Sequence, residues 1–308
     1  MNEVTALSES QPITCNNLDS LVDGFLGTQD VKQSSKDTYR KSLRAFTSWL
    51  TVKGIYNPAR EDILNYKESL RAQGLSSSTI SGYIVAVRKF FEYLESTIGY
   101  QNVAKGIKGA KRSKGFRKDP LTVEQIRELL ESIDISTIKG LRDYAILNLM
   151  LRTGLRTIEI VRSDVGDIRQ QSGEAVLWIH GKARDAKDEF VLLTQDTLKP
   201  VYEYLAGRGK INDNDPLLAS VSDRNNNQRL TTRSISRIIK KHLRDISLDN
   251  DRLTAHSLRH TFATLALMNG APLLQVKEAM RHNSIETTMV YLHSLDRVTN
   301  GAERYINF

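Results

Sequence analysis

Four short segments, in a fixed order along the chain, carry side chains that could work together on a phosphodiester. The first is TGLRTIE, which holds Arg156 and Glu159, and the second is Lys182 in a charged turn, GKARDAKD. The third is HSLRH and the fourth is RHNSIETTMVYLH. The last two segments together supply His256, Arg259, His260, His282 and Tyr291.

A phosphodiester under attack builds negative charge on its non-bridging oxygens. Two guanidinium groups can clamp those oxygens with paired, charge-assisted hydrogen bonds. Arg156 and Arg259 are the candidates, because each stands in an otherwise apolar local pattern. A histidine or lysine can add a donor or protonate the leaving group. A tyrosine hydroxyl can form a covalent phosphoester that preserves the bond energy, so that rejoining needs no ATP.

The HSLRH segment also raises the question of a metal site. On a helix, His256, Arg259 and His260 share one side, and two histidines four residues apart can hold zinc. Ser257 stands where an HExxH site has its glutamate, and the guanidinium of Arg259 would repel a cation. We therefore predict no metal here. Taken alone, the segment is better explained by two histidines that are merely hydrogen-bonded on a helix.

Taken together, the four segments resemble the tyrosine recombinase (phage integrase) family. The order TGLR, a lysine in a strand turn, HSLRH, and a histidine nine residues before a tyrosine matches that family. The spacing of 23 residues from Arg259 to His282 matches it as well. The chain is especially similar to Xer-type recombinases and to short integrases of mobile elements that lack an extra arm-binding domain. Each motif is weak alone, whereas four in order are highly specific.

The resemblance implies a phosphate clamp. Arg156 and Arg259 would bind the scissile phosphate. Glu159 would support Arg156 from behind, although a simple surface glutamate is an alternative for this residue. The resemblance implies neither a metal nor a nucleotide cofactor.

The resemblance also implies which residues transfer protons and which residue attacks the phosphate. Lys182 would be the general acid for the 5′-hydroxyl leaving group, and His256 would assist proton transfer or anchor the phosphate. His282 would add a donor to the developing charge. Tyr291 would attack and leave a 3′-phosphotyrosyl link.

Three positions depart from the family pattern. Arg281 precedes His282 where the family usually has glycine, which predicts a differently built turn. Ser163 occupies a position that is commonly leucine. Lys187, in the same turn as Lys182, is a rival for the general acid, and the neighbouring glycine favours Lys182.

The net charge of +8 and the pI of about 9.4 favour a polyanionic partner. No stretch approaches the roughly 18 apolar residues of a membrane helix, and the start lacks the pattern of a signal peptide. The single cysteine, Cys15, cannot form an internal disulfide. We therefore expect a cytoplasmic protein without a membrane partner. One stretch holds seven basic residues and no acid, namely Lys105, Lys108, Lys111, Arg112, Lys114, Arg117 and Lys118.

The elements that must position these groups are mostly helices. Apolar spacing predicts helices at about 34–50, 60–73 and 76–94. Thr122 and Gln125 form a capping-box pattern, and an apolar helix at 141–153 ends at Gly154. Two short strands, 175–180 and 189–193, flank the charged turn, and helix returns from about 231.

We therefore predict a mainly α fold with a small antiparallel sheet. It would pair an N-terminal helical core-binding (SAM-like) domain with a mixed α/β catalytic domain. The domains are expected as a disordered N-terminus at 1–15, a helical domain at 16–104, a basic linker at 105–119, a catalytic domain at 120–293, and a tail at 294–308.

The partner that follows is double-stranded DNA with a specific core site. The two domains would form a C-shaped clamp around the DNA, and the basic linker would contact its phosphates. A homotetramer would bring two sites together, held by the apolar tail. Accessory DNA-bending or directionality factors are further candidate partners. Other DNA contacts are expected from a basic helix near 231–246, through Arg233, Arg237, Lys240, Lys241 and Arg244.

Two other functions fit parts of the pattern. A topoisomerase-like relaxing enzyme would share the chemistry without strand exchange. A non-cutting DNA-binding regulator of the same fold would have no use for the full series from Arg156 to Tyr291. The main hypothesis is a site-specific recombinase that integrates or excises a mobile element or resolves DNA multimers.

Overall fold

Helix boundaries in the first part of the chain follow local capping signals. The computed structural model describes residues 15–111, 118–180 and 186–306. It divides the chain into two compact units, with the boundary between residues 115 and 116. In the first unit, the hydroxyl of Ser76 accepts a hydrogen bond from the backbone N–H of Thr79 at 3.2 Å. The described residues of this unit form four helices, α1 (Cys15–Thr28), α2 (Gln33–Lys53), α3 (Arg60–Ala72) and α4 (Ser77–Ile98).

Aromatic side chains fill the core of the first unit. Phe46 meets Tyr66 edge to face at 5.0 Å between ring centroids, and Phe90 meets Phe91 at 6.0 Å. Each fully buried aromatic of this kind contributes about 1.5–3 kcal/mol to folding. Ile107 is also buried in this core, and Ser81 donates to the carbonyl of Ala110 at 3.1 Å. The chain therefore stays packed on the helices as far as residue 110.

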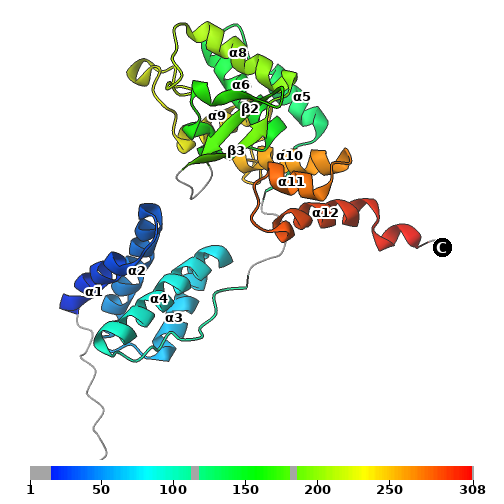
Figure 1. The fold of residues 1–308 in the computed structure, drawn as a ribbon. Helices are drawn as coiled ribbons and strands as arrows, with labels where there is room; N and C mark the ends of the chain where they lie inside the picture. The colour runs from blue at the N-terminus through cyan, green and yellow to red at the C-terminus, as the bar shows by residue number, and fades with distance from the viewer. Residues whose placement is uncertain (1–14, 112–117, 181–185, 307–308) are drawn as a thin grey trace, which may run out of the picture. The chain divides into compact units, whose positions relative to one another are not determined.

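The second unit is built around a buried central helix and a three-stranded antiparallel sheet (Figure 1). The sheet order is β1-β2-β3, with Ile168 opposite Leu177 and Trp178 opposite Phe190. Most side chains of α6 are buried, and α8 and α10 pack against it. The helices are α5 (Val123–Glu131), α6 (Ile138–Thr153), α7 (Thr157–Arg162), α8 (Gln195–Arg208), α9 (Thr232–Asp245), α10 (Ala255–Met268), α11 (Leu273–Ala279) and α12 (Ile285–Thr299), and the strands are β1 (Ile168–Gln171), β2 (Glu174–His180) and β3 (Lys187–Leu192).

The mainly helical fold with a small antiparallel sheet is thus confirmed. The capping box at Thr122 is present, because its hydroxyl accepts from Gln125 N at 3.2 Å while the Gln125 amide oxygen accepts from Thr122 N at 3.0 Å. The sheet has a third strand, β1, that the sequence pattern did not predict. Its sequence, IRQQ, has no alternation of apolar and polar residues, and its two central side chains are exposed.

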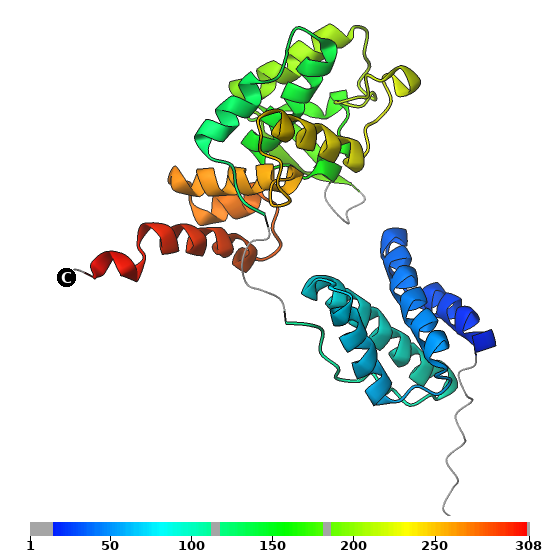
Figure 2. The same cartoon turned by 180° about the vertical axis from the view of Figure 1, so that it is seen from behind.

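The C-terminal helices form a small core of their own. Ala263, Val276, Met280 and Tyr291 are buried together where α10, α11 and α12 meet. Seen from behind, these helices lie beside one another along one side of the unit, and the chain after α12 extends away from it (Figure 2). This small core therefore holds Tyr291 against α10.

Candidate active site

A glycine at the end of α6 directs Arg156 into the site. Gly154 has a φ of +61°, in the left-handed region, and it ends α6. A Cβ placed on it would lie 2.6 Å from Cδ1 of Phe262 on α10, so no larger residue fits without a shift. Arg156 then stands at the N-cap of α7, with its side chain one quarter exposed. The close approach of α6 to α10 is therefore what brings the first arginine to the second.

Arg259 is held by main-chain carbonyls from two other segments. It is buried on α10, and its Nη1 donates to the carbonyl of Gly154 while its Nη2 donates to that of Met280. Burial, together with the charges of Arg156 and Arg281, lowers the pKa of Arg259 to about 9. The guanidinium therefore stays charged at neutral pH. A guanidinium has five N–H groups, so these two bonds fix its plane and leave donors for an anion.

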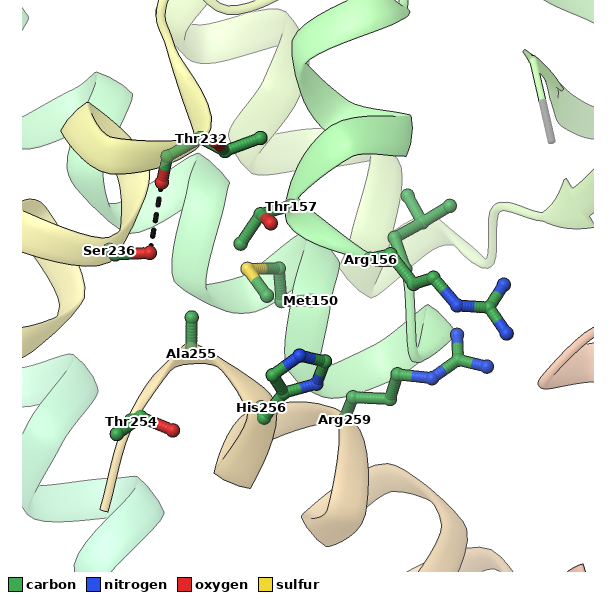
Figure 3. Close-up of a pocket in the computed structure, with 10 residues that line it drawn as sticks. Met150, Arg156, Thr157, Thr232, Ser236, Thr254, Ala255, His256 and Arg259 are labelled. Carbon is green, nitrogen blue, oxygen red and sulfur yellow. Dashed lines mark hydrogen bonds between the residues drawn. The ribbon is translucent and has the colours of Figure 1, made fainter. Parts of the chain in front are cut away.

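The two guanidinium groups extend side by side at the edge of one pocket (Figure 3). The pocket has a volume of about 240 Å³ and lies between the starts of α7, α9 and α10. His256 lines it from the same helix as Arg259. The structure therefore brings together Arg156, His256 and Arg259, as the sequence predicted.

Glu159 lies behind this pair and is shared by two arginines. Its carboxylate is fully buried and accepts from Arg156 Nη1 at 2.8 Å and from Arg281 Nη2 at 2.7 Å. It also accepts from the backbone N–H of Arg156 at 2.7 Å. Burial alone would raise the pKa of Glu159, but the charges and hydrogen bonds of Arg281 and Arg156 outweigh it and leave the pKa lowered. The carboxylate is therefore ionised, and the simple surface role does not apply.

Arg281 builds the turn before His282 in a way that the sequence did not reveal. It adopts a φ of +51°, which an L-residue other than glycine rarely does. Its side chain is only 5% exposed and lies on Glu159. The carbonyl of Arg281 accepts from Arg156 Nη2 at 3.2 Å, next to the Met280 carbonyl that holds Arg259. The turn thus orients both phosphate-clamp candidates, and its own side chain balances Glu159.

His282 follows this turn and is oriented by a buried hydroxyl. Its Nδ1 lies 2.9 Å from Oγ1 of Thr288, whose side chain is buried. Burial, followed by the charges of Arg259, Arg156 and Arg281, lowers the pKa of His282 to about 4. The imidazole is therefore neutral. With Thr288 donating to Nδ1, the ring hydrogen sits on Nε2, which can then act as a donor.

Tyr291 lies on α12 with only 4% of its surface exposed. Its hydroxyl is 2.6 Å from Nδ1 of His260, and its ring stacks on His282 at 6.4 Å between centroids with an interplanar angle of 12°. Burial raises the pKa of Tyr291 to about 12, against the opposing charges of Arg259 and Arg156. The contact with His260 was missed at the sequence level, because His260 was seen only as a third residue on one side of a helix.

The structure separates the two lysine candidates for the general acid, because Lys187 is the first residue of β3 rather than part of the turn. Lys182 lies outside the described residues. Lys187 donates to Asp164 at 2.7 Å and to Asp167 at 2.6 Å. Burial pulls the pKa of Lys187 down, but the hydrogen bonds and charges of these two carboxylates outweigh it and leave the pKa raised. Lys187 is thus a fixed ion-pair partner, which weakens it as a proton donor and favours Lys182.

Lys187→Met is expected to destabilise the protein without slowing, in its folded fraction, the strand cleavage that the sequence resemblance implies. The variant leaves Asp164 and Asp167 without their shared cation, which costs about 1–3 kcal/mol in the free energy of unfolding. Urea unfolding measures this loss, and single-turnover cleavage of a nicked DNA substrate measures the chemistry. Cleavage at least tenfold slower with unchanged stability would return Lys187 to the list of proton donors.

Ser163, where relatives of the resembled family commonly have leucine, is buried and donates to the carbonyl of Glu159 at 2.9 Å. It therefore holds the end of α7, one turn beyond the Glu159 carboxylate.

Among the described residues, no group of three or more His, Cys, Asp or Glu is placed to hold a metal ion. None of the helices that the structure describes is long and apolar enough to cross a membrane.

The basic residues proposed for DNA binding fall into two groups. Several are tied to the protein itself: Lys118 donates to the carbonyl of Asp251, and Lys240, Lys241 and Arg244 on or near α9 pair with Asp249 or Asp245. Arg233 and Arg237 are exposed on α9 and have no acidic partner within the described ranges. Of the linker, Lys105, Lys108 and Lys111 are described, whereas Arg112, Lys114 and Arg117 lie outside the described residues.

Comparison with known protein families gives two matches. The model of the phage integrase family matches residues 120–297. The model of the phage integrase N-terminal SAM-like domain matches residues 19–97. Together they cover most of both units.

Named relatives and solved structures agree with these matches. The chain is 30% identical to the tyrosine recombinase XerD of Listeria monocytogenes serotype 4b over 83% of this chain and 86% of the relative. It is 33% identical to the tyrosine recombinase XerC of Herpetosiphon aurantiacus over 83% of each. Its fold is similar to that of the XerH site-specific recombinase bound to palindromic difH substrate, with a TM-score of 0.73 and 21% identity over 93% of this chain and 84% of that one. The fold is also similar to that of a lambda integrase dimer bound to a COC′ core site, with a TM-score of 0.68 and 15% identity over 87% of this chain and 96% of that one.

Proposed function

This chain belongs to the phage integrase family and is a tyrosine recombinase, and from that premise we propose that it cuts and rejoins DNA at specific sites through a covalent link to Tyr291. The observation that carries the proposal is the pair of guanidinium groups of Arg156 and Arg259 at one pocket. Both are held from behind by protein groups, so their remaining donors face an incoming anion. Fixed donors of this kind stabilise the charge that develops on a phosphate under attack.

Each step of the reaction falls to a particular side chain. Arg156, Arg259 and His256 bind the non-bridging oxygens of the scissile phosphate, and His282 adds a donor through Nε2. Tyr291 attacks phosphorus, and the bond to the 5′-oxygen breaks. Lys182 gives that oxygen its proton. The product is a 3′-phosphotyrosyl link, from which a 5′-hydroxyl can rejoin either the same strand or a partner strand.

Double-stranded DNA is the substrate that fits the charge. Thr232 and Ser236 of α9 line the pocket that holds Arg156. Arg233 and Arg237, the next residue in each case, are exposed and have no acidic partner among the described residues. A strand leaving the pocket along α9 would therefore meet these two cations first. They, with the basic linker, would set the protein's register on the phosphates.

Recombination between two sites requires four protomers, and the tail at 294–308, whose first residues complete α12, is the proposed contact between them. Tyr305 and Ile306 are 75% and 62% exposed, so this segment offers apolar surface to a partner. A second copy of the catalytic unit is the proposed surface for this tail. Such docking would also let one protomer sense whether its neighbour has cut.

Truncation after Ser294 is expected to separate cleavage from recombination. The shortened protein keeps Tyr291 and should still cut a single nicked site within about threefold of the wild-type rate. The yield of recombinants from two sites should fall by more than about tenfold, because the tetramer depends on a contact surface that is lost. Native gels of the DNA complex and a two-site assay measure both. Normal assembly and recombination by the truncated protein would refute the docking role.

The proposed function is tested by trapping the covalent intermediate. The wild-type protein is incubated without added metal on nicked suicide substrates drawn from DNA that flanks its own gene. We expect an adduct that survives SDS, maps by peptide analysis to Tyr291, and carries the DNA by its 3′ end. A fragment that the protein binds tightly but never links covalently would argue for a non-cutting DNA-binding regulator instead. Relaxation of supercoiled DNA with no recombinant from paired sites would favour a topoisomerase-like enzyme.

A further inference from the structure

Tyr291 and His260 form a close pair inside the small C-terminal core. The hydroxyl of Tyr291 lies 2.6 Å from Nδ1 of His260, and the two ring centroids are 5.3 Å apart. His260 lies on α10, one residue after Arg259, and α10 packs against α12. Two helices that carry separate parts of the site therefore meet at the nucleophile itself.

The protonation of the two groups gives this hydrogen bond its direction. Burial, followed by the charges of His256 and Arg259, lowers the pKa of His260 to about 4, so the imidazole is neutral. The pKa of Tyr291 is raised to about 12, so its hydroxyl keeps its hydrogen. With a neutral ring and a protonated hydroxyl, the arrangement that suits a separation of 2.6 Å is donation from the tyrosine to an unprotonated Nδ1.

We infer that His260 is the general base that takes the proton of Tyr291 as the tyrosine attacks DNA. The inference rests on the proposed function, and it names the residue that accepts the proton of the Tyr291 hydroxyl. In the step, the Tyr291 O–H bond breaks, the O–P bond forms, and the bond from phosphorus to the 5′-oxygen breaks. The tyrosine proton goes to Nδ1 of His260, and the 5′-oxygen receives a different proton from the general acid. During rejoining, His260 returns its proton to the departing tyrosine oxygen.

The substrate itself makes this base effective. In the DNA-free protein, the charge of Arg259 is one of the causes that hold the imidazole neutral. A scissile phosphate bound by Arg259 places a negative charge beside that guanidinium and offsets its repulsion. The basicity of His260 then rises when the substrate is in place. The proton acceptor is thus coupled to phosphate binding through adjacent residues of one helix turn.

Two substitutions separate proton transfer from simple positioning. His260→Asn keeps an amide oxygen near the place of Nδ1, so it can still accept the hydrogen bond but cannot take the proton. His260→Phe fills the space and accepts nothing. His293→Asn, at an exposed histidine on α12, is the matched control. Single-turnover cleavage of a nicked suicide substrate is measured with each protein, together with its thermal midpoint and its DNA affinity.

We expect both His260 variants to cleave about 100-fold more slowly or worse, while His293→Asn cleaves at the wild-type rate. A second substrate with sulfur in place of the bridging 5′-oxygen needs no acid for its leaving group. It should rescue Lys182→Ala but neither His260 variant, because the deficit lies on the tyrosine side. A third variant, His260→Ala, leaves the space of the ring open, and added imidazole should restore cleavage to folded His260→Ala but not to folded His260→Phe.

The outcomes that overturn the inference are distinct. Full-rate cleavage by His260→Asn would reduce His260 to a positioning residue, and faster cleavage by His260→Phe would show that the contact restrains the tyrosine. Rescue of the His260 variants by the sulfur substrate would move its role to the leaving group. A wild-type protein that forms no adduct on DNA that it binds would overturn the proposed function, and this inference with it.

Discussion

A Tyr291→Phe protein is expected to bind its DNA site with wild-type affinity and to form no covalent adduct. The substitution removes one oxygen, and that oxygen is the proposed nucleophile. Because Tyr291 is 4% exposed, its hydroxyl contributes little to the surface that meets DNA in the free protein. An SDS gel of radiolabelled suicide substrate gives the adduct, and a gel shift gives the affinity. The loss should reach the detection limit, because the oxygen that would form the phosphoester is absent.

Tyr202→Phe, at an exposed tyrosine on α8, is the control for this experiment. Loss of the Tyr291 hydroxyl also removes its hydrogen bond to His260, at a cost of about 1–3 kcal/mol. The thermal midpoint must therefore be measured beside the adduct, so that unfolding is not mistaken for lost chemistry. An adduct that persists in the folded variant would assign the nucleophile to another residue. Unchanged biological output would instead support a non-cutting regulator.

Arg259→Lys is expected to slow the first strand cleavage by about 100- to 1,000-fold, the usual effect of removing a fixed donor from a developing oxyanion. Arg259 bonds the carbonyls of Gly154 and Met280 at once and still offers N–H groups to an anion. A lysine has one ammonium on a flexible stem and cannot bridge two carbonyls in a fixed plane. The positive charge is retained, so DNA affinity should change far less than the rate.

Arg169→Lys, on the exposed face of β1, controls for the general effect of an arginine-to-lysine change. Single-turnover rates on the nicked substrate and binding curves at several salt concentrations separate chemistry from affinity. Equal losses in rate and affinity would make Arg259 an ordinary phosphate contact. A cleavage rate within threefold of wild type would show that Arg259 does not stabilise the transition state.

Local signals in the sequence predicted much of the fold. The cap at Ser76, the capping box at Thr122 and the glycine at 154 each act within four residues, and each lies where the structure begins or ends a helix. β1 escaped prediction because its pairing partner, β2, supplies the order that its own residues do not encode. The sheet was therefore recognised, but one strand short.

The candidate site divides along the same line. Residue types and order were enough to select Arg156, His256 and Arg259, which line one pocket. The role of Arg281 could not be predicted, because it depends on a positive φ and on a carboxylate 122 residues away in sequence. The pairing of Lys187 with two carboxylates, 20 and 23 residues away in sequence, could not be predicted either. Pattern analysis finds reactive groups, whereas their partners are chosen by the fold.

The sharing of Glu159 by two arginines has a thermodynamic consequence. Arg156, Arg259 and Arg281 bring three positive charges to the turn at residues 280–281, and Glu159 returns one negative charge. The DNA-free catalytic unit therefore folds around uncompensated like charges, which repel one another and oppose the compact state. A phosphate that settles there removes that repulsion, and anything that binds the folded state alone stabilises it. Substrate capture and fold stability are thus linked, and this enzyme is at its least stable when it is away from DNA.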